Sequence, residues 1–149
     1  MNPGRIITAL LLGITFLLPH TAEAENSKDF GEYVIHFNAL STDLLPPQVA
    51  REYRITRSRN RGMINITVLK KIADTPGQPV HARVEAHAEN LVGQDRNIRL
   101  REIREGHAIY YIGEFRVAHE ETLKFTVRAR PQGTQEFMEV RFSQDFYTN

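Results

Sequence analysis

Four arginines lie close together in the segment R-I-T-R-S-R-N-R, at positions 54, 57, 59 and 61. Arg57, Arg59 and Arg61 alternate with other residues, so their side chains project to the same side of an extended chain. Neighbouring guanidinium groups can bind a phosphate, a sulfate or an acidic protein surface through paired hydrogen bonds. The alternative is ion pairing within the chain, for which the candidate acids are Glu102, Glu105, Glu120 and Glu121.

A second charged segment, R-E-I-R-E-G at residues 101–106, has charges of both signs. Glu102, Arg104 and Glu105 could form an ion-pair network that fixes a β-bulge at Arg101–Glu102, where the apolar alternation breaks. The same charges could instead select a partner by charge complementarity. The predicted binding surface, either for a protein or for an anionic ligand, comprises eight residues of these segments and of the later E-E pair: Arg57, Arg59, Arg61, Glu102, Arg104, Glu105, Glu120 and Glu121.

The histidines are the candidate metal ligands. His81 and His87 lie on one face of a predicted strand, but positions i and i+6 of a strand are roughly 20 Å apart, too far to share an ion. Each would need further ligands from neighbouring strands. His36, His107 and His119 are isolated in the sequence, and it does not show whether they converge.

No arrangement typical of an enzyme is present in the sequence. The segment H-E-E-T-L that begins at His119 resembles H-E-x-x-H, but Leu123 stands where the second metal ligand is required. There is no G-x-S-x-G elbow and no phosphate-binding P-loop. We therefore expect no catalytic residues and no cofactor. A hydrolase with carboxylate or histidine chemistry is the less favoured alternative.

Composition excludes several other functions. The 149 residues include 19 Lys and Arg against 18 Asp and Glu, a net charge of +1, and no Cys. A nearly neutral chain is not typical of a nucleic-acid binder. Without Cys, the chain has no disulfides, no cysteine-ligated zinc and no lipid-modified cysteine.

Residues 1–24 resemble a secretory signal peptide. Arg5 precedes the apolar run I-I-T-A-L-L-L-G-I-T-F-L-L, and Ala22-Glu23-Ala24 is a typical cleavage site. The apolar run is shorter than the roughly 20 residues that span a bilayer. We expect cleavage after Ala24 and a single periplasmic domain of residues 25–149, with no membrane span. An uncleaved N-terminal anchor is the alternative.

The rest of the chain alternates apolar and polar residues with period two, which is typical of half-buried strands. In the strand predicted around residues 109–117 both faces are apolar, since Tyr110 and Ile112 lie on the face opposite to that of Ile109 and Tyr111. That strand should be covered on both sides. The predicted strands are centred on residues 33–39, 64–68, 80–88, 98–103, 109–117, 123–129 and 140–142.

A short helix is predicted after Pro46 and Pro47, because proline suits the first helical turn and Val49 and Tyr53 share one face. Seven short strands separated by turns in this length favour an immunoglobulin-like antiparallel β-sandwich. An up-and-down barrel is the alternative. The polar residues 25–29 are expected to be a loose N-terminus.

Several motifs resemble a family of small exported proteins of gamma-proteobacteria known as a domain of unknown function. They are R-S-R at 57–59 with I-N-I-T-V-L-K at 64–70, N-L-V-G-Q at 90–94, R-E-I-R-E-G-H-A-I-Y-Y-I at 101–112, E-F at 114–115 and E-E-T-L at 120–123. F-G-E-Y at 30–33 and Q-D-F-Y at 144–147 also fit. The resemblance implies an exported β protein and assigns no catalytic residue. It leaves His81 and His87 outside the shared motifs and places seven charged candidates inside them: Arg57, Arg59, Glu102, Arg104, Glu105, Glu120 and Glu121.

Three functions follow as expectations. The first is a periplasmic, non-catalytic binding or accessory module that uses its Arg/Glu-rich loops to contact a protein or an anionic ligand. The second is a metal-binding or metal-delivery protein that uses surface histidines. The third is a hydrolase.

Overall fold

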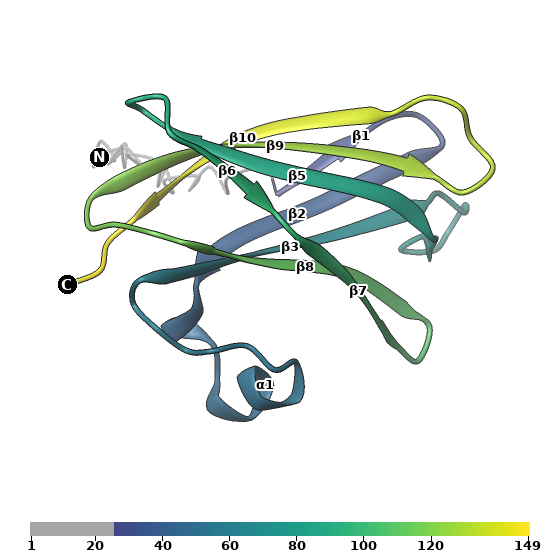
Figure 1. Cartoon of the computed structure of the whole chain (residues 1–149). Helices are drawn as coiled ribbons and strands as arrows, with labels where there is room; N and C mark the ends of the chain where they lie inside the picture. Colours follow the sequence, from purple (N-terminus) through teal and green to yellow (C-terminus); the bar gives the residue numbers. More distant parts are fainter. Residues whose placement is uncertain (1–25) are drawn as a thin grey trace, which may run out of the picture.

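The computed structural model describes residues 26–149, which form two antiparallel β-sheets packed face to face (Figure 1). Sheet A has the strand order β1-β2-β3-β8-β7, with β4 paired to β3, and sheet B has the order β10-β9-β5-β6. The strands are β1 (Ser27–Asp29), β2 (Tyr33–Ser41), β3 (Arg61–Lys70), β4 (Gln78–Pro79), β5 (Ala82–Asn90), β6 (Asp95–Ile98), β7 (Leu100–Glu105), β8 (Ala108–Arg116), β9 (Glu121–Pro131) and β10 (Met138–Phe146). The predicted all-β sandwich is confirmed.

The described residues contain ten strands rather than about seven. Ser27–Asp29, expected to be loose, pairs with β2 because its main-chain groups complete the edge of sheet A. The expected bulge at Arg101–Glu102 is wrong, since β7 pairs with β8 in an unbroken register from Leu100 to Glu105. The interruption lies one step earlier, at Arg99, where the chain leaves sheet B as β6 and joins sheet A as β7.

Gly113, on β8, allows this crossing. A Cβ atom at Gly113 would lie 2.4 Å from the Cγ2 of Ile98 and 2.9 Å from the Cδ2 of Leu100, the residues on either side of the switch. Any larger residue would therefore push the crossing strand away from β8. Strands that change sheets in this way close the side of a sandwich, and Figure 1 shows β6 and β7 running diagonally across it.

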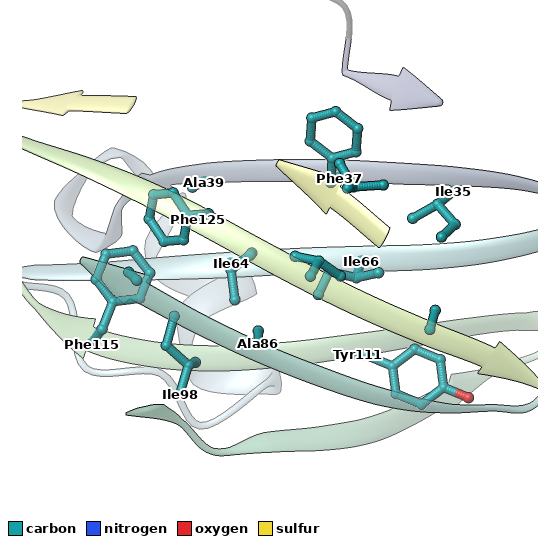
Figure 2. Close-up of a cluster of buried hydrophobic side chains, with 14 of the residues drawn as sticks. Ile35, Phe37, Ala39, Ile64, Ile66, Ala86, Ile98, Tyr111, Phe115 and Phe125 are labelled. Atoms are coloured by element: carbon teal, nitrogen blue, oxygen red, sulfur yellow. The ribbon is translucent and has the colours of Figure 1, made fainter. Parts of the chain in front are cut away.

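The core between the sheets is built around aromatic rings. Phe125 of sheet B stacks on Phe142 at 4.8 Å, and Phe142 stacks on Phe37 of sheet A at 4.6 Å. Phe115 packs edge-on against Phe125 at 5.2 Å. Isoleucines such as Ile64, which is completely buried, fill the space around them (Figure 2). The alternating apolar residues of the sequence thus meet in one continuous core.

A second, smaller apolar cluster lies on the outer face of sheet A. There α1 (Pro47–Glu52) and the chain around it cover the strands, with Ala50 and Ile55 packed against Met63 and Ile112. The expected cover over both faces of β8 is therefore present. The segment that covers this face begins with a 3-10 turn, Thr42–Leu44.

Thr42 fixes this covering segment to the sheet. The side chain is completely buried, and its Oγ1 atom donates toward the carbonyl oxygen of Thr56 at 2.8 Å and lies 3.1 Å from that of Ser58. The same oxygen accepts the main-chain N–H of Ser58 at 2.9 Å. Both ends of the segment are held together, so α1 stays over the sheet.

Among residues 26–149, no helix is long and apolar enough to cross a membrane. The predicted signal peptide, residues 1–24, lies outside the described residues.

Candidate functional site

The arginine segment does not pair with the acids expected for it. Arg57 donates from its Nη2 atom to the main-chain oxygen of Asp43 at 2.8 Å. The Nη1 atom of Arg61 lies 3.6 Å from the Oε1 atom of Glu114. Arg59 is exposed, and no carboxylate of residues 26–149 lies within ion-pair distance of its guanidinium group. This segment therefore keeps free positive charge at the surface.

The strand register explains this separation. Arg61 stands opposite Arg116 at one end of β8, whereas Glu105 stands opposite Ala108 at the other end. Eight residue steps of a strand span roughly 25 Å. The Arg57–Arg61 segment and the acids of β7 consequently lie at different ends of the sheet.

Glu102 is instead the centre of a network that links the two sheets. Its Oε1 atom accepts from Arg104 Nε at 2.7 Å and lies 3.1 Å from His81 Nδ1. Its Oε2 atom accepts from the Tyr111 hydroxyl at 3.2 Å. That hydroxyl in turn accepts the main-chain N–H of Ala82, on β5, at 2.7 Å. The network joins β7 and β8 of sheet A to β5 of sheet B.

The contacts of this network and its burial shift the pKa values of Glu102 and Tyr111. The hydrogen bond from Arg104 lowers the pKa of Glu102, against the effect of burial, and His81 and Tyr111 lower it further. Burial raises the pKa of Tyr111, although the Ala82 N–H opposes this. At neutral pH the carboxylate is therefore ionised and the phenol is protonated, as an acceptor and donor pair requires.

Glu121 holds the turn between β8 and β9. It accepts hydrogen bonds from Arg96 at 2.5 Å, the main-chain N–H of Ala118 at 2.8 Å and the side chain of Asn90 at 3.1 Å. Burial alone would raise the pKa of Glu121, but these three donors lower it below its ordinary value. A carboxylate with three donors and a side chain only 9% exposed has the contacts of a structural group.

The neighbouring Glu120 is exposed and has a positive φ of 51°. Its carboxylate lies 3.6 Å from His119 Nε2, and His119 Nδ1 accepts the N–H of Thr148 at 3.2 Å. His119 is therefore engaged with the C-terminal residues and not with the other histidines.

The histidines do not converge on a metal site. His81 lies beside Glu102, whereas His87 lies on the outer face of sheet B beside Lys124 and Arg141. Within residues 26–149, no three His, Asp or Glu side chains are placed to hold a metal ion together. His81 and Glu102 form a pair of possible ligands without a third.

A pocket of about 230 Å³ lies between α1 and the outer face of sheet A. Its walls are apolar apart from two asparagines, Asn38 and Asn65, which stand opposite each other on β2 and β3. The Oδ1 atom of Asn65 is buried and has no hydrogen-bond partner among the described residues. The other lining residues are Leu40, Leu45, Val49, Tyr53, Ile55, Met63, Tyr110 and Ile112.

Two contacts hold α1 over this pocket. The Tyr53 hydroxyl donates a short hydrogen bond to Glu105 Oε2, and Arg101 donates to the main-chain oxygen of Tyr53. The bond to Glu105 raises the pKa of Tyr53 to about 12. Among the predicted site residues, Glu105 is thus the one that braces the pocket through α1.

Neither the role of Asn65 nor the pocket is predicted from the sequence, although part of the signal is present there. The helix face of Val49 and Tyr53 and the apolar outer face of β8 were both recognised. Combining them would have placed the helix on that strand. The unpaired amide of Asn65 carries no signal in the sequence, because it depends on which groups surround it.

Comparison with known proteins supports the same architecture. A DUF4426 family protein from Pseudomonas aeruginosa has a TM-score of 0.69 and 29% identity, over 81% of this chain and 93% of that one. FetP of uropathogenic Escherichia coli, expressed in the periplasm of a laboratory strain, has a TM-score of 0.58 at 8% identity, over 81% of this chain and 92% of that one.

A copper-bound variant of FetP gives a TM-score of 0.57 at 8% identity, over 80% of this chain and 93% of that one. At 8% identity, the structural likeness to FetP shows a shared fold and nothing more. A search of the curated proteins finds no match. The family described as a domain of unknown function, DUF4426, matches residues 27–149. The chain therefore belongs to the DUF4426 family.

Proposed function

We propose that this chain is an exported, non-catalytic binding module and that its binding site is the pocket beneath α1. The observation that carries the proposal is the Oδ1 atom of Asn65, which is buried in an apolar pocket without a hydrogen-bond partner among residues 26–149. Leaving such a group unpaired costs about 1–3 kcal/mol. A ligand that donates a hydrogen bond to this oxygen while filling the pocket would recover that free energy.

The size of the pocket favours a single side chain as the occupant. Pockets for drug-sized molecules measure about 300–1,000 Å³, and this one measures about 230 Å³. An apolar body with one polar donor at its far end describes tyrosine and tryptophan. These residues are also enriched, together with arginine, among the hot spots of protein interfaces. The proposed ligand is therefore a Tyr or Trp side chain of a partner protein.

The surface around the pocket fits such a partner. Leu44, in the 3-10 turn before α1, is 72% exposed and precedes the lining residue Leu45. Arg57 and Arg59 follow the wall residue Ile55 and stand at the surface. The Arg-rich segment would therefore meet acidic residues that flank the anchor, and Glu105 acts through Tyr53 to hold the pocket open.

The titratable groups favour binding over catalysis. A general acid at neutral pH needs a carboxyl group with a raised pKa. Among the described residues, hydrogen bonds lower the pKa of the carboxyl groups of Asp29, Glu102 and Glu121. Each of these carboxylates is occupied by donors of the chain itself.

The test uses amino-acid amides, because the chain contains no tryptophan and the emission of a tryptophan probe reports binding directly. N-acetyltryptophanamide should bind with a blue shift in emission. N-acetyltyrosinamide should compete for the same pocket about fivefold more strongly than the phenylalanine analogue, which lacks the donor. Equal competition by the tyrosine and phenylalanine amides would contradict the role of Asn65.

Two variants make this test specific. Asn65→Leu should remove the preference for tyrosine over phenylalanine. The control Asn97→Leu makes the same exchange at an exposed position of β6 and should retain this preference. Arg57→Ala combined with Arg59→Ala should weaken binding of an acidic pentapeptide centred on tyrosine. The same double variant should bind a neutral pentapeptide unchanged.

Metal binding is the second candidate, and the likeness to a copper-bound FetP variant is what favours it. In this chain the pair His81–Glu102 would supply two ligands at neighbouring positions. Calorimetric titration with Cu²⁺ and Zn²⁺ tests it. Micromolar binding that His81→Gln abolishes and His87→Gln leaves intact would support a site at this pair.

Export is proposed from the N-terminal sequence and from the periplasmic production of FetP. Cell fractionation should place the protein in the periplasm. Mass spectrometry of the purified chain should give an N-terminus at Glu25, whereas a chain that begins at Met1 would contradict cleavage after Ala24.

A further inference from the structure

The outer face of sheet B carries an unusual pair of like charges. Arg83 on β5 stands directly opposite Arg130 on β9. Like charges at directly opposed positions of an antiparallel pair destabilise the sheet. In the next row Arg128 has acids on both sides, Glu85 on β5 and Glu139 on β10. The row of Arg83 and Arg130 has no acid to separate them.

Phe137 holds these guanidinium groups in place. The centroid of its ring lies 4.5 Å from the Arg128 guanidinium carbon, 5.2 Å from that of Arg130 and 6.0 Å from that of Arg83. A cation over an aromatic face is favourable, and the ring also limits the conformations of the side chains. Three arginines are thus gathered around one ring.

The carboxylates nearby neutralise only part of this charge. Glu85 accepts from Arg83 at 3.0 Å and lies 3.7 Å from Arg128. Arg130 is half-buried, and no carboxylate of the described residues lies within 4 Å of it. A half-buried guanidinium group without an acid is the part of the cluster left to bind a ligand.

Arg83 and Arg130 also line a hollow of about 420 Å³. His81 forms another part of its wall, and the turn from Pro131 to Thr134 closes one side. Gln132 anchors that turn by donating its main-chain N–H to the carbonyl oxygen of His81 at 2.8 Å. The hollow therefore lies between two strand ends, with Arg83 and Arg130 among its lining residues.

We propose that this hollow binds a dianionic tetrahedral oxyanion of the phosphate type. Two guanidinium groups can each direct paired N–H donors at such an anion. The anion would also screen the repulsion between Arg83 and Arg130. The site is on the opposite sheet from the pocket beneath α1, so the two proposals stand or fall separately.

Isothermal titration with inorganic phosphate at low ionic strength tests the proposal. Phosphate should bind and should raise the unfolding temperature of the protein, by an amount that grows with the logarithm of its concentration above the dissociation constant. Acetate, a monoanion of different shape, should bind about tenfold more weakly. Absence of a phosphate signal, or equal binding of acetate, would overturn the proposal.

Variants locate the anion. Arg130→Gln should raise the dissociation constant for phosphate about tenfold, and Arg130→Lys should raise it less, because it keeps the charge but loses the paired donors. Arg83→Gln gives an independent second measurement. Arg116→Gln, which removes one exposed positive charge from sheet A, is the matched control and should change binding less than twofold.

A general charge effect would be shown by equal losses in Arg130→Gln and Arg116→Gln, and that result would contradict the site. Without phosphate, Arg130→Gln should differ little in stability from the wild-type protein, because the loss of the like-charge repulsion offsets the loss of the contact with Phe137. Binding of N-acetyltryptophanamide should be the same in Arg130→Gln and in the wild-type protein.

Discussion

The Tyr111 hydroxyl accepts the main-chain N–H of Ala82 at 2.7 Å, and this single contact joins β8 of sheet A to the start of β5 in sheet B. The same hydroxyl donates to Glu102, so the phenol is satisfied as both acceptor and donor. Figure 2 shows the Tyr111 ring within the buried cluster, with its oxygen directed away from the other labelled side chains. The apolar ring thus belongs to the core and its hydroxyl to the hydrogen-bond network at the margin.

Replacing Tyr111 by Phe should lower the free energy of unfolding by about 1–3 kcal/mol, because the Ala82 N–H loses its acceptor. Urea denaturation measures this directly. Tyr110→Phe is the matched control, since its ring lies on the opposite face of β8 and its hydroxyl makes no hydrogen bond within the described residues. Equal losses in the two variants would contradict the structural role of the Tyr111 hydroxyl.

Replacing Glu121 by Gln should destabilise the protein by about 2 kcal/mol at neutral pH, because charge-assisted hydrogen bonds are lost. The control Glu120→Gln, one residue away and 73% exposed, should change stability little.

The effect of Glu121 should also depend on pH. The folded-state pKa of Glu121 is lowered from 4.5, so its stabilisation is present above the unfolded-state pKa and is lost as pH falls through the folded-state pKa. The difference between wild-type and Glu121→Gln should therefore be largest near neutral pH and shrink below about pH 4. Urea midpoints at several pH values measure this, and a difference that stays constant down to pH 2 would be inconsistent with it.

Replacing Glu105 by Gln should return the pKa of Tyr53 from about 12 toward the ordinary value near 10. Absorbance titration of tyrosinate reports this, with Tyr53→Phe identifying the signal among the five tyrosines of the chain. The contribution of Tyr53 to stability should be present below about pH 10 and lost as pH rises through about 12.

Loss of the same hydrogen bond should loosen α1. Amide hydrogens of α1 should exchange faster in Glu105→Gln, while those of the core strand β9 should be unaffected. Glu136→Gln, an exposed exchange outside the α1 region, should leave α1 protected. Unchanged exchange in α1 would mean that the Tyr53–Glu105 contact does not hold the helix.

Replacing Gly113 by Ala should destabilise the sandwich by about 1–3 kcal/mol, because the new methyl group would overlap Ile98 at the strand switch. The double variant Gly113→Ala with Ile98→Ala should lose less than the sum of the two single variants, since removing Ile98 makes room for the methyl group. Thermal unfolding of the four proteins gives the coupling. Strict additivity would indicate that the Gly113–Ile98 contact is not limiting.

Local patterning was sufficient for most of the strands. The alternation around Ile64 and Ile66, and that around Phe125 and Val127, predicted strands that are central in the two sheets. A period of two depends only on neighbouring residues, so one sequence reveals it. β1 and β4 were missed because they are short and are fixed by the main chain of β2 and β3.

The charged candidates were recognised by type, but their partners were not. The sequence offers Glu102, Glu105 and Glu121 as partners for the arginines of residues 57–61. In the structure Glu102 contacts His81 and Arg104. Glu105 contacts Tyr53, and Glu121 contacts Arg96. Ion pairing depends on which strands are neighbours. That information is absent from the spacing of charges along one strand.

The sequence by itself determined that the chain is an all-β protein with one short helix, because alternation and turn chemistry are local properties. Tertiary structure alone decided that the strands form a sandwich and not a barrel, that the Asn65 Oδ1 atom is buried without a partner among the described residues and that Arg83 stands opposite Arg130. Each of these depends on strand order and register, which arise from packing between residues distant in the sequence. The sites proposed for binding are products of that packing.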